Sequence, residues 1–309
     1  MREGGPIEDV HGDDLAGTVA WRALHREAVD RLTAAGVPSP EVDARRIVER
    51  ASGNEGAAFA LGLDDLVTIR GVAAFDRMLA RREAGEPLQY VLGGWGFRRL
   101  DLFVDRRVLI PRPETEQVVE AALGELRRSG GVGPAARPVT VVDLGTGSGA
   151  IALSIAVEHV HASVWATDAS PDALAVARAN VAGVGRPGGR VRVVEGDWFA
   201  ALPGELRGEV DLVVSNPPYV ADGDELPAEV VDWEPTAALI AGTSGLEHLE
   251  RIVADAPGWL RLGGGLVVEL APWQAAPVVE LAGRAGFTSA QVGRDLSGRD
   301  RYVVARLGA

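Results

Sequence analysis

The residues with the most informative chemistry are Asn216-Pro217-Pro218-Tyr219, which stand directly after the apolar run 211–215. That run is typical of a buried strand, and two prolines cannot continue a strand. They stiffen the backbone at the carboxyl end of the strand, where open α/β sheets bind ligands. Rigid amide and carbonyl acceptors at that place can hold a planar NH2 group, although an Asn-Pro pair by itself more often marks only a turn.

A glycine-rich loop lies upstream, after an apolar run that is typical of a strand. The loop is Gly145-Thr146-Gly147-Ser148-Gly149. Its glycines let the backbone turn tightly and approach a ligand. Together with Ala150 it also satisfies the relaxed dinucleotide fingerprint, so nicotinamide binding stays open at this point. The preceding Asp143 contacts a cofactor directly or through water, or it only holds the loop.

Acidic residues follow the next two expected strands. Asp168 stands where a carboxylate accepts hydrogen bonds from both ribose hydroxyls, with capping of the following helix as the alternative. Asp197 can bond an adenine amino group and Trp198 can pack against the ring, although a tryptophan beside a strand end is often only core. With Asn216, this order of elements is the one expected of an S-adenosylmethionine site that faces an amide or amine. A dehydrogenase gives no reason for the Asn-Pro-Pro-Tyr element.

The elements that must position these residues alternate from Val139 onward between strands and helices, the pattern of a mostly parallel sheet. Strands are expected at residues 139–144, 163–167, 191–195, 210–215, 265–270, 289–292 and 302–306. The last two would pair as a hairpin. We therefore predict an α/β fold, a Rossmann-like class I methyltransferase sheet with a terminal antiparallel hairpin.

The chain before this alternation has a different character. Helical periodicity predicts helices over 21–35, from Pro40 with Ser39 as its N-cap, and over 72–83. The expected divisions are a disordered tail, a packed helical domain, a β-hairpin linker and the methyltransferase domain, at residues 1–18, 19–88, 89–113 and 114–309.

Composition narrows the function. The chain has 309 residues, of which 44 are acidic and 31 basic, so its net charge is −13. This charge argues against a broad surface that binds nucleic acid or an anionic membrane. All basic residues are arginine and cysteine is absent, which excludes lysine and thiol chemistry. The five histidines have no metal-ligand spacing, so we predict no metal site. With no leader pattern and no run of about eighteen apolar residues, we expect a soluble, cytoplasmic protein.

Several further segments are distinctive, and the strongest is VLIPRPETE at 108–116. Others are GEPLQY at 85–90, WGF at 95–97, EPTAAL at 234–239, GL at 245–246 and DLSG at 295–298 followed by Arg301. Together these segments resemble the release factor glutamine methyltransferases. The sequence departs from the family pattern at Ala271, where a glycine is expected; this bears on the end of a strand and not on the chemistry.

The resemblance implies S-adenosylmethionine-dependent methylation of the glutamine side-chain amide (N5) in the Gly-Gly-Gln loop of class 1 peptide chain release factors. Asn216, Pro217 and Tyr219 are then catalytic, and Pro218 joins them in substrate binding. Segment 110–116, with Arg112 and Glu114, lines the cleft beside the cofactor. The alternative for that segment is a proline-stiffened linker whose Thr115 caps the next helix. The resemblance also implies that the helical domain at 19–88 is a substrate-recognition domain, which contacts the release factor.

Two other functions remain open from the sequence. An adenine-N6 amino methyltransferase acting on DNA or RNA shares Asn-Pro-Pro-Tyr, but the charge of −13 and the absence of a basic segment interleaved with aromatic residues argue against it. A non-catalytic protein that binds a translation factor is opposed by the intact cofactor elements.

Overall fold

The computed structural model describes residues 19–130 and 137–308. The chain separates into two compact units, Met1–Leu92 and Gly93–Ala309. The tail expected at 1–18 lies outside the described residues. Within those residues, no helix combines the length and the apolar character needed to cross a membrane.

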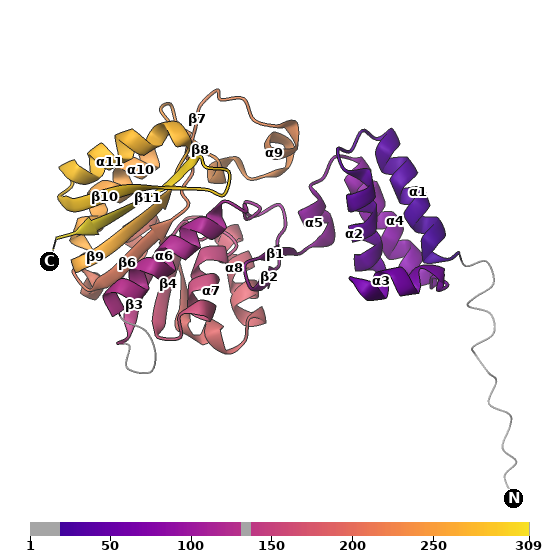
Figure 1. The fold of residues 1–309 in the computed structure, drawn as a ribbon, viewed down its shortest axis with the longest axis horizontal. Helices are drawn as coiled ribbons and strands as arrows, with labels where there is room; N and C mark the ends of the chain where they lie inside the picture. The colour runs from indigo at the N-terminus through magenta and orange to yellow at the C-terminus, as the bar shows by residue number, and fades with distance from the viewer. Residues whose placement is uncertain (1–18, 131–136, 309) are drawn as a thin grey trace, which may run out of the picture. The chain divides into compact units, whose positions relative to one another are not determined.

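The first unit is helical. Its helices are α1 Trp21–Ala34, α2 Pro40–Ser52, α3 Ala57–Leu61, α4 Ile69–Glu83 and α5 Leu88–Leu92. Figure 1 shows α1, α2 and α4 side by side, and their apolar faces share one buried cluster that includes Leu32, Ile47 and Phe75. This cluster gives the unit a core of its own.

The helix boundaries in this unit follow from local capping. Ser39 takes the N-cap position of α2 as expected, although its side chain makes no capping hydrogen bond. The Thr68 hydroxyl accepts a hydrogen bond from the Gly71 N–H at 3.1 Å. This cap starts α4 at Ile69, before the residue at which the periodic pattern begins.

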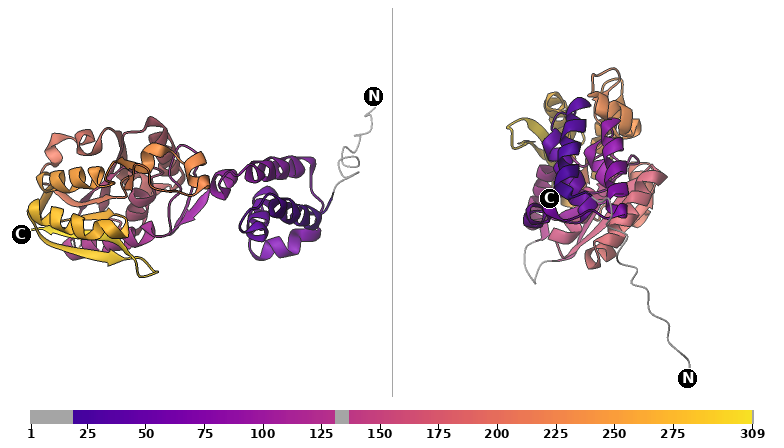
Figure 2. Two further views of the ribbon diagram at one scale, coloured as in Figure 1. Left: turned by 90° about the horizontal axis from the view of Figure 1, so that it is seen from above. Right: turned by 90° about the vertical axis from the view of Figure 1, so that its right-hand side faces the viewer.

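The second unit contains the sheet. Its main strands are β3 Val139–Leu144, β4 Ala162–Asp168, β5 Val191–Glu195, β6 Val210–Ser215, β9 Leu260–Glu269, β10 Phe287–Arg294 and β11 Asp300–Leu307. They form one sheet in the order β10-β11-β9-β6-β3-β4-β5. Strand β11 is antiparallel to both neighbours, and the other pairs are parallel. The predicted fold class is therefore confirmed, and the yellow hairpin β10–β11 forms one edge of the sheet (Figures 1 and 2).

The strand order reverses at β3, where the chain first adds β4 and β5 on one side and then β6 and β9 on the other. Ligands of open α/β sheets bind at the carboxyl ends of the strands that flank such a reversal. The topology thus brings the glycine loop after β3 next to Asn216 after β6.

Helices cover both faces of this sheet. The remaining elements are β1 Trp95–Phe97, β2 Leu100–Leu102, α6 Thr115–Gly130, α7 Ala150–Glu158, α8 Pro171–Gly183, β7 Val220–Ala221, α9 Ala228–Trp233, β8 Ile240–Gly242, α10 Glu247–Asp255 and α11 Ala275–Arg284. Strand residues Val142 and Val213 share a core cluster with α10 and α11. A Cβ on Gly265 of β9 would lie 3.5 Å from Glu125 of α6, so α6 covers the opposite face.

The largest difference from the expected strand ends is at the start of β9, and the end of the same strand shows how Ala271 is accommodated. Strand β9 begins at Leu260, well before the predicted residue 265, because the strand runs through Gly263 and Gly264, which interrupt the apolar pattern. Ala271, which replaces an expected glycine, adopts φ −74° and ψ 151°. That is extended backbone open to any residue, so alanine fits there without strain.

Candidate functional site

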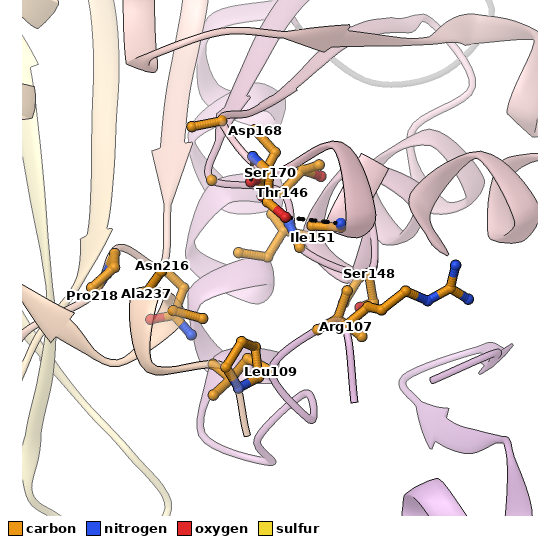
Figure 3. Close-up of a pocket in the computed structure, with 18 of the residues that line it drawn as sticks. Arg107, Leu109, Thr146, Ser148, Ile151, Asp168, Ser170, Asn216, Pro218 and Ala237 are labelled. Atoms are coloured by element: carbon orange, nitrogen blue, oxygen red, sulfur yellow. Dashed lines mark hydrogen bonds between the residues drawn. The ribbon is translucent and has the colours of Figure 1, made fainter. Parts of the chain in front are cut away.

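A cavity of about 460 Å³ lies at the carboxyl ends of β3, β4, β5 and β6. Nine predicted site residues line it: Gly145, Thr146, Gly147, Ser148, Asp168, Asp197, Trp198, Asn216 and Pro218. Figure 3 shows Asn216 and Pro218 on one side of the cavity, with Thr146 and Asp168 across it. Six predicted residues are not among its lining: Asp143, Gly149, Pro217, Tyr219, Arg112 and Glu114.

The glycine loop is held by Asp143, which is fully buried beneath it. Asp143 Oδ2 accepts hydrogen bonds from Thr146 Oγ1 at 2.7 Å and from the Ala152 N–H at 3.1 Å. Asp143 Oδ1 is buried and has no partner in the described part of the chain. Burial raises the pKa of Asp143 to about 7, against the lowering effect of the Thr146 hydrogen bond. The loop-holding role of Asp143 is therefore visible in the geometry.

Glycine is required within the loop for conformational reasons. Gly145, Gly147 and Gly149 have φ values of 69°, 55° and 85°. These lie in the left-handed region that residues with a Cβ avoid. A Cβ on Gly147 would meet nothing within 4 Å, so the loop leaves open space above that residue.

Asp168 ties the loop to the second strand. Its Oδ2 accepts from the Gly147 N–H and its Oδ1 accepts from the Ser170 N–H, both at 2.9 Å. Burial raises the pKa of Asp168. The helix cap that was the alternative for Asp168 is supplied instead by Ser170, whose hydroxyl accepts from the Ala173 N–H at 3.2 Å. Each Asp168 oxygen keeps a lone pair for a further donor.

The residues after β5 have partners that the sequence did not indicate. Asp197 is exposed and forms an ion pair with Arg251 at 2.7 Å. Trp198 adopts φ 50°, which is rare for a bulky residue. Its ring lies 5.2 Å from the His248 ring between centroids, and a Cβ on Gly145 would be 3.3 Å from Trp198 Cζ3. Trp198 thus packs over the glycine loop.

Asn216 makes one direct side-chain hydrogen bond, and the hydrogen bonds of its neighbours connect it to three further elements, β3, α6 and β9. The Ser215 hydroxyl donates to the Leu144 carbonyl at 2.7 Å, which joins the ends of β6 and β3. Asn216 Nδ2 donates to Thr115 Oγ1 at 3.2 Å, and Thr115 Oγ1 donates to Glu269 Oε2 at 2.7 Å. Thr115 stands at the start of α6 and Glu269 at the end of β9.

Pro217 and Tyr219, the two motif residues that do not line the cavity, lie behind Asn216 and Pro218. Pro217 is buried and Tyr219 is half-buried against the core cluster. The Tyr219 hydroxyl donates to Glu269 Oε1 at 3.4 Å, and burial raises the pKa of this phenol. In this structure, Tyr219 supports the motif from behind and does not line the cavity.

Arg112 and Glu114 hold their segment in place by ion pairs. Arg112 Nη2 lies 2.5 Å from Oε1 of the buried Glu234, whose Oε2 accepts from the Ile110 N–H at 3.1 Å. Glu114 pairs with Arg299 at 3.2 Å. Within this segment Pro111 and Thr115 line the cavity, and so do Arg107, Val108 and Leu109 directly before it.

Sequence reasoning missed several lining residues: Ala169, Ser170, Ala173, Pro235, Ala237, Ala238 and His248. For Pro235, Ala237 and Ala238 the signal was present, since the segment EPTAAL was noted without a role. His248 carried no signal, because its place depends on how α10 packs. Among the described residues, no cluster of His, Asp and Glu side chains is suited to hold a metal ion.

Two known families match different parts of this chain. The PrmC N-terminal domain family matches residues 23–93, and the methyltransferase small domain family matches residues 134–232. The methyltransferase domain makes S-adenosylmethionine the cofactor. The cavity fits such a group, because its volume lies in the range of about 300–1,000 Å³ common for cofactor sites and it joins an open glycine loop to a carboxylate with spare acceptor capacity.

Solved structures support the fold. The methyltransferase domain of delta-N METTL16 aligns with a TM-score of 0.50 at 19% identity, covering 77% of this chain and 96% of that one. The hMettl16 catalytic domain, solved in complex with an RNA hairpin, also gives a TM-score of 0.50, at 17% identity. It covers 77% of this chain and 81% of that chain.

Curated relatives are much nearer in sequence. A release factor glutamine methyltransferase of Cereibacter sphaeroides is 43% identical, over 92% of this chain and 97% of the relative. That of Deinococcus radiodurans is 42% identical, over 92% of this chain and 98% of the relative. On this similarity across nearly its whole length, the chain belongs to the release factor glutamine methyltransferase family.

Proposed function

We propose that the chain methylates the side-chain amide nitrogen (N5) of the glutamine in the Gly-Gly-Gln loop of class 1 peptide chain release factors. The names of its relatives support the class of substrate. The observation that carries the chemistry is the side chain of Asn216, which borders the same cavity as the glycine loop and Asp168. Its nitrogen is engaged by Thr115, which leaves Oδ1 free to accept a hydrogen bond.

We assign the cofactor half of the site to the residues after β3, β4 and β5. Bound S-adenosylmethionine supplies a methyl group carried on a positively charged sulfonium. The backbone of Gly145–Gly149 cradles it, and Asp168 accepts from the ribose hydroxyls with the lone pairs that the backbone leaves unused. Asp197 and Trp198 border the adenine. Asp143 holds the loop, and its unpartnered Oδ1 is available to the amino-acid part.

The acceptor half rests on Asn216 and the two prolines. An amide nitrogen is a poor nucleophile because its lone pair is delocalised. Asn216 Oδ1 and the Pro217 carbonyl accept its two N–H bonds, orient the nitrogen and stabilise the positive charge that grows on it. Pro218 walls the pocket and Tyr219 holds the motif in place. Transfer would form the N–CH3 bond as the S–CH3 bond breaks, which would leave a neutral thioether, and the amide would then lose one proton to solvent.

Recognition of the protein substrate falls to the remaining predicted parts. Arg112 and Glu114 hold the segment that borders the cavity, and we assign them to the binding of the glutamine loop. The helical domain at 19–88 docks the release factor, and the linker at 89–113 joins it to the methyltransferase domain at 114–309.

The test supplies methyl-labelled S-adenosylmethionine with one acceptor at a time: a class 1 release factor, duplex DNA or transfer RNA. We expect label on the Gly-Gly-Gln glutamine of the release factor. Label on nucleic acid alone would make the chain a nucleic-acid amino methyltransferase. Binding of the release factor without label on any acceptor would make it a non-catalytic partner.

A further inference from the structure

Glu269 is a buried carboxylate whose place in the fold is not explained by packing. It ends β9, is 1% exposed and does not line the cavity. No described residue forms an ion pair with it. A buried carboxylate that no ion pair neutralises costs stability, even with the charge of Arg301 nearby, and an apolar residue of similar size would avoid that cost. Its presence therefore calls for a task that an apolar side chain cannot perform.

That task is visible in the direction of two hydrogen bonds. A threonine hydroxyl has one proton and two lone pairs. Thr115 donates its proton to Glu269 Oε2 at 2.7 Å. Its oxygen can then only accept from Asn216, and it does so from Nδ2 at 3.2 Å.

The direction matters because Asn216 carries a donor and an acceptor on the same carbon. If Thr115 had no carboxylate beside it, its hydroxyl proton would be free to turn toward Asn216 and bind Oδ1. The Asn216 amide would then rotate and present N–H groups to the N–H groups of the substrate. Two facing donors repel each other, so this orientation cannot hold a glutamine NH2.

We propose that Glu269 is a positioning residue for methyl transfer, acting through the Thr115 hydroxyl to keep the Asn216 amide turned with its oxygen toward the substrate. This inference rests on the proposed function. Glu269 also accepts from the Tyr219 hydroxyl at 3.4 Å. It thus holds both ends of the Asn-Pro-Pro-Tyr motif from behind. Strands β6 and β9 are direct neighbours in the sheet, which keeps the distance between Glu269 and the motif fixed.

The kinetic test compares variants that remove or keep each link. Thr115→Val and Glu269→Leu should each lower kcat about tenfold, the effect of one hydrogen bond, with the affinity for S-adenosylmethionine unchanged. Thr115→Ser and Glu269→Gln keep a hydroxyl and an acceptor oxygen, and both should retain most of kcat. Because the links form one relay, the double variant Thr115→Val/Glu269→Leu should be no slower than either single variant. Unchanged kcat in Thr115→Val, or additive losses in the double variant, would overturn the inference.

A second readout needs no catalysis. The chain has three asparagines, Asn54, Asn180 and Asn216, so ¹⁵N-asparagine labelling yields three side-chain NH2 signals. Asn216 is assigned by its loss in Asn216→Asp. In Thr115→Val and in Glu269→Leu its signal should move and exchange faster with solvent, while Asn180, bonded to the Phe103 and Ser148 carbonyls, stays unchanged as the folding control.

The two readouts separate the inference from the proposed function. If the wild-type protein does not methylate a release factor, the proposed function fails, and the NH2 signal still decides whether Glu269 orients Asn216. If the wild-type protein is active but the Asn216 signal is the same in Thr115→Val, the relay is wrong and the proposed function stands.

Discussion

Asn216 carries two hydrogen-bonding groups at one carbon, and its surroundings give them different tasks. Nδ2 is engaged by Thr115 at 3.2 Å, while no described residue donates to Oδ1. In the proposed reaction the residue is therefore already oriented, with one acceptor available. Such preorganised groups contribute more to rate than groups that must first turn.

Replacing Asn216 by alanine should remove most methyl transfer and leave cofactor binding largely intact. The loss of one positioned partner costs about 3 kcal/mol, roughly a hundredfold or more in rate. Turnover with a release factor and calorimetric titration with S-adenosylmethionine measure the two effects separately. Asn54→Ala, in the helical unit, is the matched control. An equal loss of turnover and of cofactor affinity would assign Asn216 a structural role.

Replacing Asp168 should mainly weaken cofactor binding, whereas replacing Asn216 should mainly slow methyl transfer. The Asp168 carboxylate already accepts from two backbone N–H groups, one from Gly147 in the glycine loop and one from Ser170 after β4, and we assign its remaining lone pairs to the ribose. Asp168→Ala should weaken S-adenosylmethionine binding by about 1.5–3 kcal/mol, the range for hydrogen bonds to a charged group. Equilibrium titration measures this, with Glu195→Ala as an exposed control on the neighbouring strand. Unchanged affinity would remove the ribose assignment.

At the scale of elements, the predictable features are those encoded within one short segment. Strands β3, β5 and β6 occur at the predicted residues, because each is an apolar run followed by glycine, acidic or proline residues that end it. The glycine loop and the Asn-Pro-Pro-Tyr motif are likewise local. Their position at neighbouring strand ends followed from the rule that parallel strands share a carboxyl edge.

Features that join distant segments were not predictable. Glu269 stands two residues before the departure at Ala271 and was assigned no role from the sequence, yet it bonds Thr115 and Tyr219 from far along the chain. The pairing of Arg112 with Glu234 is of the same kind. Such contacts depend on how α6, β6 and β9 pack, which one sequence does not reveal. For the same reason the packing of Tyr219 against the core could not be predicted.

The buried carboxylate at the end of β9 predicts a pH dependence of stability. Burial raises the pKa of Glu269 to about 7, against hydrogen bonds from Thr115 and Tyr219 and the nearby charge of Arg301, which lower it. The nearby Glu114 raises it further. Between its ordinary pKa and about pH 7 the folded state binds more protons than the unfolded state, so stability falls as pH rises through this window.

Glu269→Gln cannot ionise and should lose less stability than the wild type between about pH 5 and about pH 8. Thermal unfolding at several pH values compares the stability of the two proteins. The transition to follow is the one whose midpoint rises when S-adenosylmethionine is added, because it reports on the unit that contains Glu269. Asp143 has a pKa raised in the same direction, but it is present in both proteins and cancels in the difference. A wild-type and variant pair with parallel pH profiles would contradict the raised pKa of Glu269.

At the scale of the whole molecule, the chain contains two units with separate cores. Separate cores predict separate unfolding, and a ligand that binds one unit stabilises that unit alone. We expect two calorimetric transitions, of which S-adenosylmethionine raises only one. Phe75 is fully buried in the helical unit. Phe75→Ala should lower the free energy of unfolding of that unit by about 3–5 kcal/mol and leave the transition of the other unit unchanged.

A single transition that responds to both the ligand and Phe75→Ala would contradict this independence. It would mean that the two cores unfold as one cooperative system.

The most direct test of the account is mass spectrometry of a class 1 release factor after incubation with S-adenosylmethionine and either the wild-type chain or Asn216→Ala. We predict that the wild type adds one methyl group to the glutamine of the Gly-Gly-Gln loop and that Asn216→Ala adds almost none in the same time. An unmodified glutamine after incubation with folded, cofactor-binding wild-type protein would contradict the account.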